Sequence, residues 1–129
     1  MVKAPSQRKL NTLRREWQKR LKLQDWKIIV GWAEEKFLQD ITATETPVGA
    51  CEYFPEAKEA KVWLLRPEDW AEEENKRERD FENTIVHEML HCHFAHFADD
   101  GKVSVLIKEQ LIEALTEALL ELKRGNGRK

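Results

Sequence analysis

The spacing of hydrophobic positions predicts a helix near the start of the chain. Apolar side chains recur there every third or fourth residue, at Leu10, Leu13, Trp17 and Leu21. This is the repeat of one helix face, and Ser6 is a residue type that caps a first helical turn. The predicted helix therefore runs from Ser6 to about Leu21.

Three stretches rich in β-branched and aromatic residues predict strands. They are residues 26–32, 50–54 and 61–65, which read WKIIVGW, ACEYF and KVWLL. The second and third are separated by the turn 56–60, so they are expected to pair as an antiparallel hairpin. Residues 33–40, which follow the first strand, fit either a short helix or an irregular excursion.

The hydrophobic pattern returns to a helical repeat in the second half of the chain. Pro67 suits the start of a single helical turn. A longer helix is then expected from about Arg79 to Ala98, where the sequence Asp-Asp-Gly at 99–101 ends it. A last helix, capped by Ser104, is expected to follow.

Together these elements predict one α+β domain over residues 1–129: an N-terminal helix, a small three-stranded, mostly antiparallel sheet, and two further helices. The 129 residues are enough for one modest core, and 41% hydrophobic residues is typical of a globular protein. No stretch has the length of a membrane span, and the N-terminus lacks the apolar core of a signal peptide. A membrane is therefore not expected as a partner.

Charge and cysteine usage narrow the function classes further. The formal net charge of −2 argues against nucleic acid as a partner. The first predicted helix is basic, but a solvated face explains this better than a nucleic-acid patch. Cys51 and Cys92, the only cysteines, suggest neither a disulfide framework nor a Cys-based zinc cluster, so a cytoplasmic location is expected.

Residues 87–91 read His-Glu-Met-Leu-His and carry the candidate chemistry. On a helix His87 and His91 lie one turn apart and aim at one point. Two neutral imidazoles form half of a tetrahedral zinc site, and Glu88 is placed to act on a zinc-activated water. The alternative is a buried helix with two incidental histidines, which the helical context and the later glutamates argue against.

A helical projection separates the other side chains of this helix. His87 and His91 fall at the edge of the apolar arc, where core meets solvent. His93 falls inside the arc and is predicted to be a core histidine or one that supports a ligand, while His96 is predicted at the surface or a pocket rim. Cys92 projects away from the two ligands. The arc consists of Val86, Met89, Leu90, Phe94 and Phe97.

The last predicted helix, which runs to about Lys123, offers a third zinc ligand. Glu109 and Glu113 both lie beside its apolar arc, at the border where a cleft would open. Glu117 and Glu121 turn toward solvent and are predicted to be solvated charges. The apolar arc is carried by Leu111, Leu115, Ala118, Leu119 and Leu122.

Residues 84–91 and 109–115, together with the order of the predicted elements, resemble the gluzincin zinc metallopeptidases. The resemblance is strongest to their smallest members, the minigluzincins, and to short phage-type metallopeptidases. It implies that His87 and His91 bind zinc and that Glu88 is the general base. The family pattern Glu-x-x-x-Asp reads Glu109-x-x-x-Glu113 here, which favours Glu109 as third ligand and Glu113 as its supporting partner over the reverse.

The resemblance implies a zinc metallopeptidase that hydrolyses a peptide or protein substrate. It also implies that the third strand, residues 61–65, is the sheet edge that holds extended substrate by main-chain pairing. Tyr53 and His96 are candidates for stabilising the oxyanion. The alternatives are a zinc-binding regulatory or interaction module without turnover, and a DNA-associated protease that uses the basic first helix.

Overall fold

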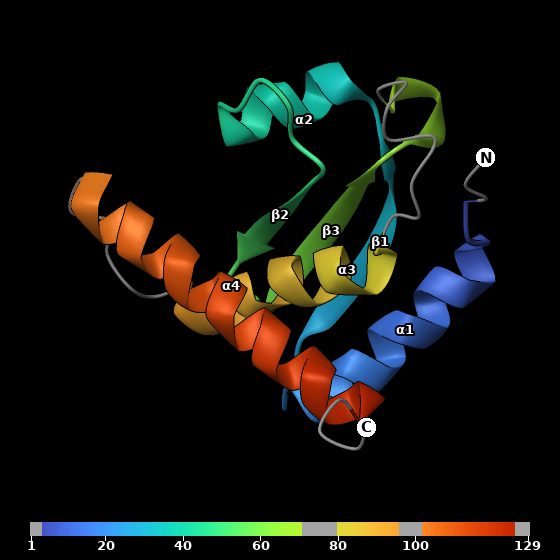
Figure 1. Cartoon of the computed structure of the whole chain (residues 1–129), viewed down its shortest axis with the longest axis vertical. Helices are drawn as coiled ribbons and strands as arrows, with labels where there is room; N and C mark the ends of the chain where they lie inside the picture. The colour runs from blue at the N-terminus through green and yellow to red at the C-terminus, as the bar shows by residue number, and fades with distance from the viewer. Residues whose placement is uncertain (1–3, 71–79, 96–101, 126–129) are drawn as a thin grey trace.

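The computed structural model describes residues 4–70, 80–95 and 102–125 and confirms the α+β class. Figure 1 shows a small sheet with α3 lying across it and α4 beside α3. None of the helices in the described ranges is both long and apolar enough to cross a membrane. The elements, in chain order, are α1 (Gln7–Arg20), β1 (Lys27–Ala33), α2 (Glu35–Thr42), β2 (Gly49–Phe54), β3 (Glu59–Leu65), η1 (Pro67–Asp69), α3 (Phe81–Leu90), η3 (His91–Phe94) and α4 (Lys102–Arg124).

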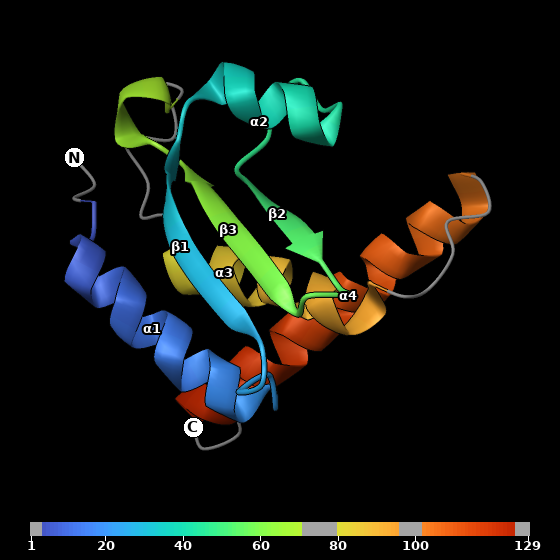
Figure 2. The ribbon, with the colours of Figure 1, turned by 180° about the vertical axis from the view of Figure 1, so that it is seen from behind.

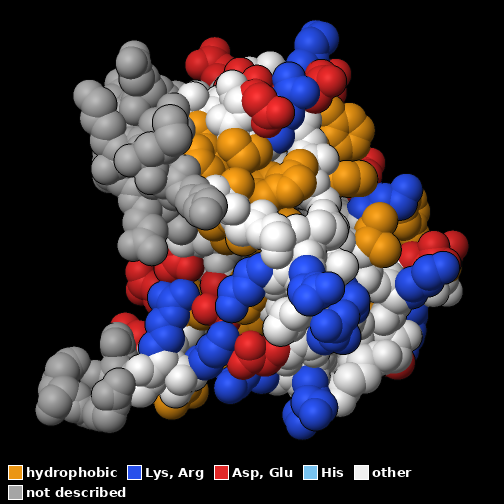
Figure 3. Space-filling view, turned by 90° about the vertical axis from the view of Figure 1, so that its right-hand side faces the viewer, with side chains coloured by type: hydrophobic (Ala, Val, Ile, Leu, Met, Phe, Trp, Pro, Cys, Tyr) orange, Lys and Arg blue, Asp and Glu red, His pale blue; other side chains and the backbone are white. Residues whose placement is uncertain are grey.

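The first helix forms as its sequence predicts. Ser6 accepts a hydrogen bond from the backbone N–H of Lys9 at 3.1 Å and so caps α1. The apolar stripe of α1 is buried at Leu10, Leu13 and Trp17. The outward face is basic, and Figure 3 shows Lys and Arg side chains gathered on this side of the molecule, over α1.

The sheet is mixed, which corrects the prediction of a mostly antiparallel sheet. The strand order is β1-β3-β2. The predicted hairpin of β2 and β3 is confirmed, but β1 pairs with β3 in parallel. The reason is α2, which turns the chain back after β1, so that β3 inserts between β1 and β2 (Figure 2). The sequence of residues 33–40 fits either a short helix or an irregular excursion, and the structure forms the helix.

The third strand is therefore central, and its prediction as a sheet edge was wrong. β3 starts at Glu59, two residues before the predicted strand, and hydrogen-bonds to a neighbour on each side. Burial of Ala60, Val62 and Leu64 fits a central position, because a central strand is covered more fully than an edge. The two sheet edges are β1 and β2.

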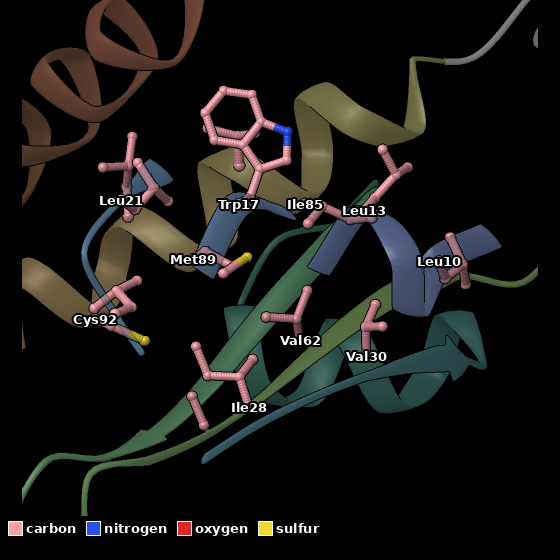
Figure 4. Packing of buried hydrophobic residues seen from close by; sticks show 14 of the residues in the cluster. Leu10, Leu13, Trp17, Leu21, Ile28, Val30, Val62, Ile85, Met89 and Cys92 are labelled. Atoms are coloured by element: carbon pink, nitrogen blue, oxygen red, sulfur yellow. The ribbon is translucent and has the colours of Figure 1, made fainter. Parts of the chain in front are cut away.

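One face of the sheet packs against α1 and α3 to form the main core, shown in Figure 4. α2 covers part of the other face, where the rings of Phe37 and Trp63 meet edge to face with centroids 5.6 Å apart. α4 adds Ile112 and Leu120 to this core. The main core includes Leu10, Trp17, Ile28, Val30, Val62, Ile85, Val86 and Met89.

The α-helix that carries the His-Glu-x-x-His motif is shorter than predicted. It begins at Phe81, where Asp80 caps it by accepting from the N–H of Asn83 at 3.0 Å. It ends at Leu90 and continues as the tighter helix η3, so the prediction of an α-helix through residue 95 was wrong. The predicted limits, Arg79 and Ala98, lie outside the described residues.

The last helix packs in a register that its hydrophobic pattern did not predict. α4 begins at Lys102, so Ser104 lies within the helix and not at the N-terminal position predicted for it. Its buried positions are Ile112, Thr116 and Leu120, whereas the predicted core residues Leu111 and Leu122 are 45% and 78% exposed. The Thr116 hydroxyl donates to the carbonyl of Ile112 at 2.7 Å, which lets a polar residue type be buried.

Glu82 joins the three helices that surround the core. Its carboxylate accepts a hydrogen bond from Trp17 Nε1 of α1 at 2.6 Å and forms ion pairs with Lys123 and Arg124 of α4. Burial alone would raise the pKa of Glu82, but hydrogen bonds from Lys123, Trp17 and Arg124 together lower this pKa below its ordinary value. Glu82 therefore contributes to stability mainly as a charged group.

Replacing this carboxylate should make stability less dependent on acid pH. The contribution of a group with a lowered folded-state pKa is present above its ordinary pKa and is lost as the pH falls through the folded value. Glu82→Gln should lower the free energy of unfolding by about 1–3 kcal/mol at pH 7. The difference in free energy of unfolding between this variant and the wild type should disappear below about pH 4.

Urea unfolding at several pH values measures this difference. Glu56→Gln, in the exposed turn between β2 and β3, is the matched control and should change stability by less than about 0.5 kcal/mol. The contradicting result is a free energy of unfolding that differs between Glu82→Gln and wild type by the same amount from pH 7 to pH 3. That result would show that the charge of Glu82 is not what joins the helices.

Candidate metal centre

His87 and His91 lie together on the side of α3 that faces away from the core. Their ring centroids are 5.5 Å apart. His91 follows the end of the α-helix but keeps right-handed helical dihedrals, φ −57° and ψ −27°. It therefore stays one turn above His87, and the early end of α3 does not separate the pair. Both side chains are mostly buried, at 19% and 18% exposure.

Glu109 of α4 faces both imidazoles. Its Oε1 lies 3.2 Å from Nε2 of His87, and its Oε2 lies 3.1 Å from Nε2 of His91. The packing of α4 on α3 creates this contact between residues that are remote in sequence. The two histidines thus present the same ring nitrogen to one carboxylate.

These three side chains fit a zinc ion by distance and by donor type. Their ligand atoms all lie within 4.8 Å of one another. Tetrahedral zinc with bonds of about 2.0–2.2 Å places its ligand atoms about 3.4 Å apart, close to the separations of 3.2 and 3.1 Å seen here. Two imidazoles and one carboxylate leave the fourth position open, as in hydrolytic zinc sites.

Glu88 is a buried acid beside this group. Its side chain is 8% exposed, and it forms no hydrogen bond or ion pair with any described residue. Burial, and secondly the charge of Glu109, raise the pKa of Glu88 to about 8. An unpaired buried carboxyl group costs about 1–3 kcal/mol, so this side chain weakens the fold at the candidate site.

A cleft of about 450 Å³ opens onto the three potential ligands. The α2–β2 connection and β2 form one wall, and α4 forms the other. The ring of Tyr53 on β2 stacks on His91 with centroids 6.5 Å apart and planes inclined by 11°. Tyr53 is thus placed beside a potential ligand, which the sequence alone did not show.

Gly49 allows β2 to approach α3 this closely. A Cβ atom at this position would lie 2.7 Å from Cγ2 of Thr84 and 2.9 Å from the carbonyl oxygen of Trp63, distances too short for real contacts. The same atom would lie 3.6 Å from the Glu88 carboxylate. Only glycine therefore fits where the sheet edge meets the helix that carries the motif.

Glu113, the other glutamate considered as a ligand, lies outside the converging group. It is exposed, and no hydrogen bond joins it to His87 or His91. It lines a neighbouring cavity together with His87 and Glu88. Within the described part of the chain, no group of His, Cys, Asp or Glu other than His87, His91 and Glu109 converges on one point.

The prediction that His93 is a core or ligand-supporting histidine was wrong. His93 is exposed, and its Nε2 lies 2.6 Å from the carbonyl oxygen of Leu21, just after α1. The projection at about 100° per residue does not apply to His93, because the α-helix ends at Leu90 and residues 91–94 form η3. His96 lies outside the described residues.

The two cysteines are not positioned as thiolate ligands. Cys92 is buried in the main core. A hydrogen bond with Cys92, and burial, raise the pKa of the Cys51 thiol well above its usual range. Both cysteines thus remain outside the group formed by the two histidines and Glu109.

No protein-family model, curated protein or solved structure matches this chain. Its function is therefore inferred from the residues of the site and their geometry.

The sequence did not predict that β2 and Gly49 form a wall of the site, because this depends on the order of strands in the sheet. The local sequence around Gly49 gives no sign that a side chain is excluded there, because the atoms that exclude it belong to Thr84 and Trp63, which are remote in sequence.

Substitution of the two candidate glutamates should have unequal effects on metal binding. Glu109→Gln should weaken zinc binding by at least about 100-fold, because the loss of groups that merely support ligands already costs about 10- to 100-fold. Glu113→Gln should change the affinity by less than about threefold, since Glu113 forms no hydrogen bond or ion pair with either histidine. Competition titration with a chromophoric chelator measures both affinities. Equal losses in the two variants would contradict the assignment of Glu109.

Proposed function

We propose that this protein is a zinc metallopeptidase of the gluzincin type. The observation that carries the proposal is the convergence of His87, His91 and Glu109 beside the buried carboxyl group of Glu88, which has no hydrogen-bond partner among the described residues. A purely structural zinc site has no use for an acid next to its first ligand. It would also fill the fourth position with a further side chain.

In the proposed reaction His87, His91 and Glu109 hold the metal. When bound, zinc supplies Lewis acidity that polarises the scissile carbonyl and lowers the pKa of a water molecule. In its ionised form Glu88 takes the proton from the attacking water and delivers it to the amine that leaves. The burial of Glu88 keeps bulk water away from this proton transfer.

The proposed substrate is a peptide in extended form. β2 is a sheet edge and lines the cleft at Gly49, Cys51 and Tyr53, so in the proposal a substrate strand pairs along the outer edge of β2. β2 takes the role that the sequence had assigned to residues 61–65. Because Cys51 and Cys92 are free thiols, the proposal includes a reducing compartment such as the cytoplasm.

Glu88→Gln tests the proposed reaction directly. The variant should bind zinc like the wild type, since Glu88 is not one of the converging ligands, and should lose about 100- to 10,000-fold in hydrolysis rate. The measurement is mass spectrometry of a mixed peptide pool incubated with zinc-loaded protein. Glu56→Gln, in the exposed turn, is the control and should cleave like the wild type.

Two outcomes would contradict the proposal. Undiminished cleavage by Glu88→Gln would show that this residue is not the general base. A wild-type protein that binds zinc tightly but cleaves no peptide in the pool would instead support a zinc-binding module without turnover.

A further inference from the structure

α4 carries a glutamate at every fourth position from Glu109 to Glu121. Residues four apart lie one turn and about 40° apart on a helix, so Glu113, Glu117 and Glu121 follow Glu109 in a row that winds gradually around α4, away from the metal centre. All three are exposed, and none pairs with another residue in the described ranges. Like charges at this spacing destabilise a helix. The row of carboxylates therefore does not serve the folding of α4.

This row lines a groove that starts at the metal centre. A cavity of about 330 Å³ shares His87 and Glu88 with the main cleft and is bounded on the α4 side by Glu113 and Glu117. A further depression shares Asn83 and Glu117 with this cavity and is lined beyond them by Glu121 and by Arg124, whose guanidinium pairs with Asp80 and Glu82. The three exposed carboxylates thus follow one continuous path away from the candidate ligands.

The carboxyl group of Glu88 lies at the buried end of this path. Glu88 lines the same cavity, is 8% exposed and forms no hydrogen bond with another described residue. Buried polar groups are nearly always paired with protein, water or a ligand. The cavity is therefore built to receive a polar ligand at its inner end, next to the row of negative charges.

We propose that Glu113, Glu117 and Glu121 bind the basic side chains of an extended peptide substrate whose scissile bond lies at the metal centre. This inference rests on the proposed peptidase function and adds the substrate class. Neighbouring carboxylates of the row are separated by four helix residues, or about 6 Å. Every second side chain of an extended peptide points the same way, at intervals of about 6.6 Å.

The two spacings match, so lysine or arginine at alternate substrate positions can meet successive carboxylates. The groove from Glu109 to Glu121 spans about 18 Å, twelve residues at about 1.5 Å each. An extended peptide covers this length with about five residues. The basic residues of the substrate should therefore lie within about five positions of the bond that is cut.

Two fluorescein-labelled peptides test this inference, one with lysine at alternate positions and one with glutamine at those positions. Zinc-loaded Glu88→Gln protein is titrated with each, and fluorescence anisotropy gives the Kd. The lysine peptide should bind about tenfold more tightly, and this preference should shrink in high salt. Adding Glu117→Gln should weaken its binding about threefold, whereas adding Glu56→Gln should change nothing.

Replacing all three glutamates of the row by glutamine should abolish the preference. This triple variant should be at least as stable as its parent, because it removes like-charge repulsion and keeps good helix formers. Equal binding of the two peptides to the parent, or an undiminished preference in the triple variant, would overturn the inference.

Cleavage by the zinc-loaded wild type separates this inference from the peptidase proposal. If the wild type cuts both peptides equally well, the acidic groove is not a subsite, although the peptidase function stands. If the lysine peptide binds through the row but no peptide is cut, the binding site stands and the peptidase proposal fails.

Discussion

The packing of α4 across α3 is the contact on which the candidate site depends. It rests on a narrow stripe, Ile112, Thr116 and Leu120, of which Thr116 is buried only because its hydroxyl bonds within its own helix. If α4 packed on α3 through positions shifted by one residue, the helix would be rotated by about 100°. Glu109 would then point away from the two histidines. Glu82 holds the far end of the same helix to α1 and α3. Core packing and one ion-pair cluster thus set the geometry of the polar site beside them.

Several features at this site weaken the fold locally. Glu88 is buried without a partner in the part of the chain that the structure describes, β2 begins with a glycine in a space that admits no side chain, and like charges follow one another along α4. Local rules of stability are most often broken where a protein binds or reacts. These departures lie around one cleft and its extension, while the core beneath them is regular and apolar. Their common location is what connects the proposed reaction with the proposed acidic subsite.

Much of this arrangement could be predicted from sequence, because it depends on local patterns. The first helix and its Ser6 cap, the β2–β3 hairpin and the turn at Pro67 all follow from spacing and turn chemistry. The sequence also brought His87, His91 and Glu109 together as one candidate group. What could not be predicted depends on tertiary contacts. The parallel pairing of β1 follows from the path of α2. His93 lies beyond the end of the α-helix, where the α-helical projection does not apply, and α4 packs through Ile112, Thr116 and Leu120 rather than through its predicted leucines.

The most direct test of the account is a crystal structure of the zinc-loaded protein, with anomalous scattering recorded at the zinc edge. The account predicts one zinc per chain, bound by Nε2 of His87, Nε2 of His91 and a carboxylate oxygen of Glu109, with no fourth protein ligand. Glu88 should lie beside the ion without coordinating it. Zinc bound through Glu113 or a cysteine sulfur, or a fourth side chain closing the site, would contradict the account.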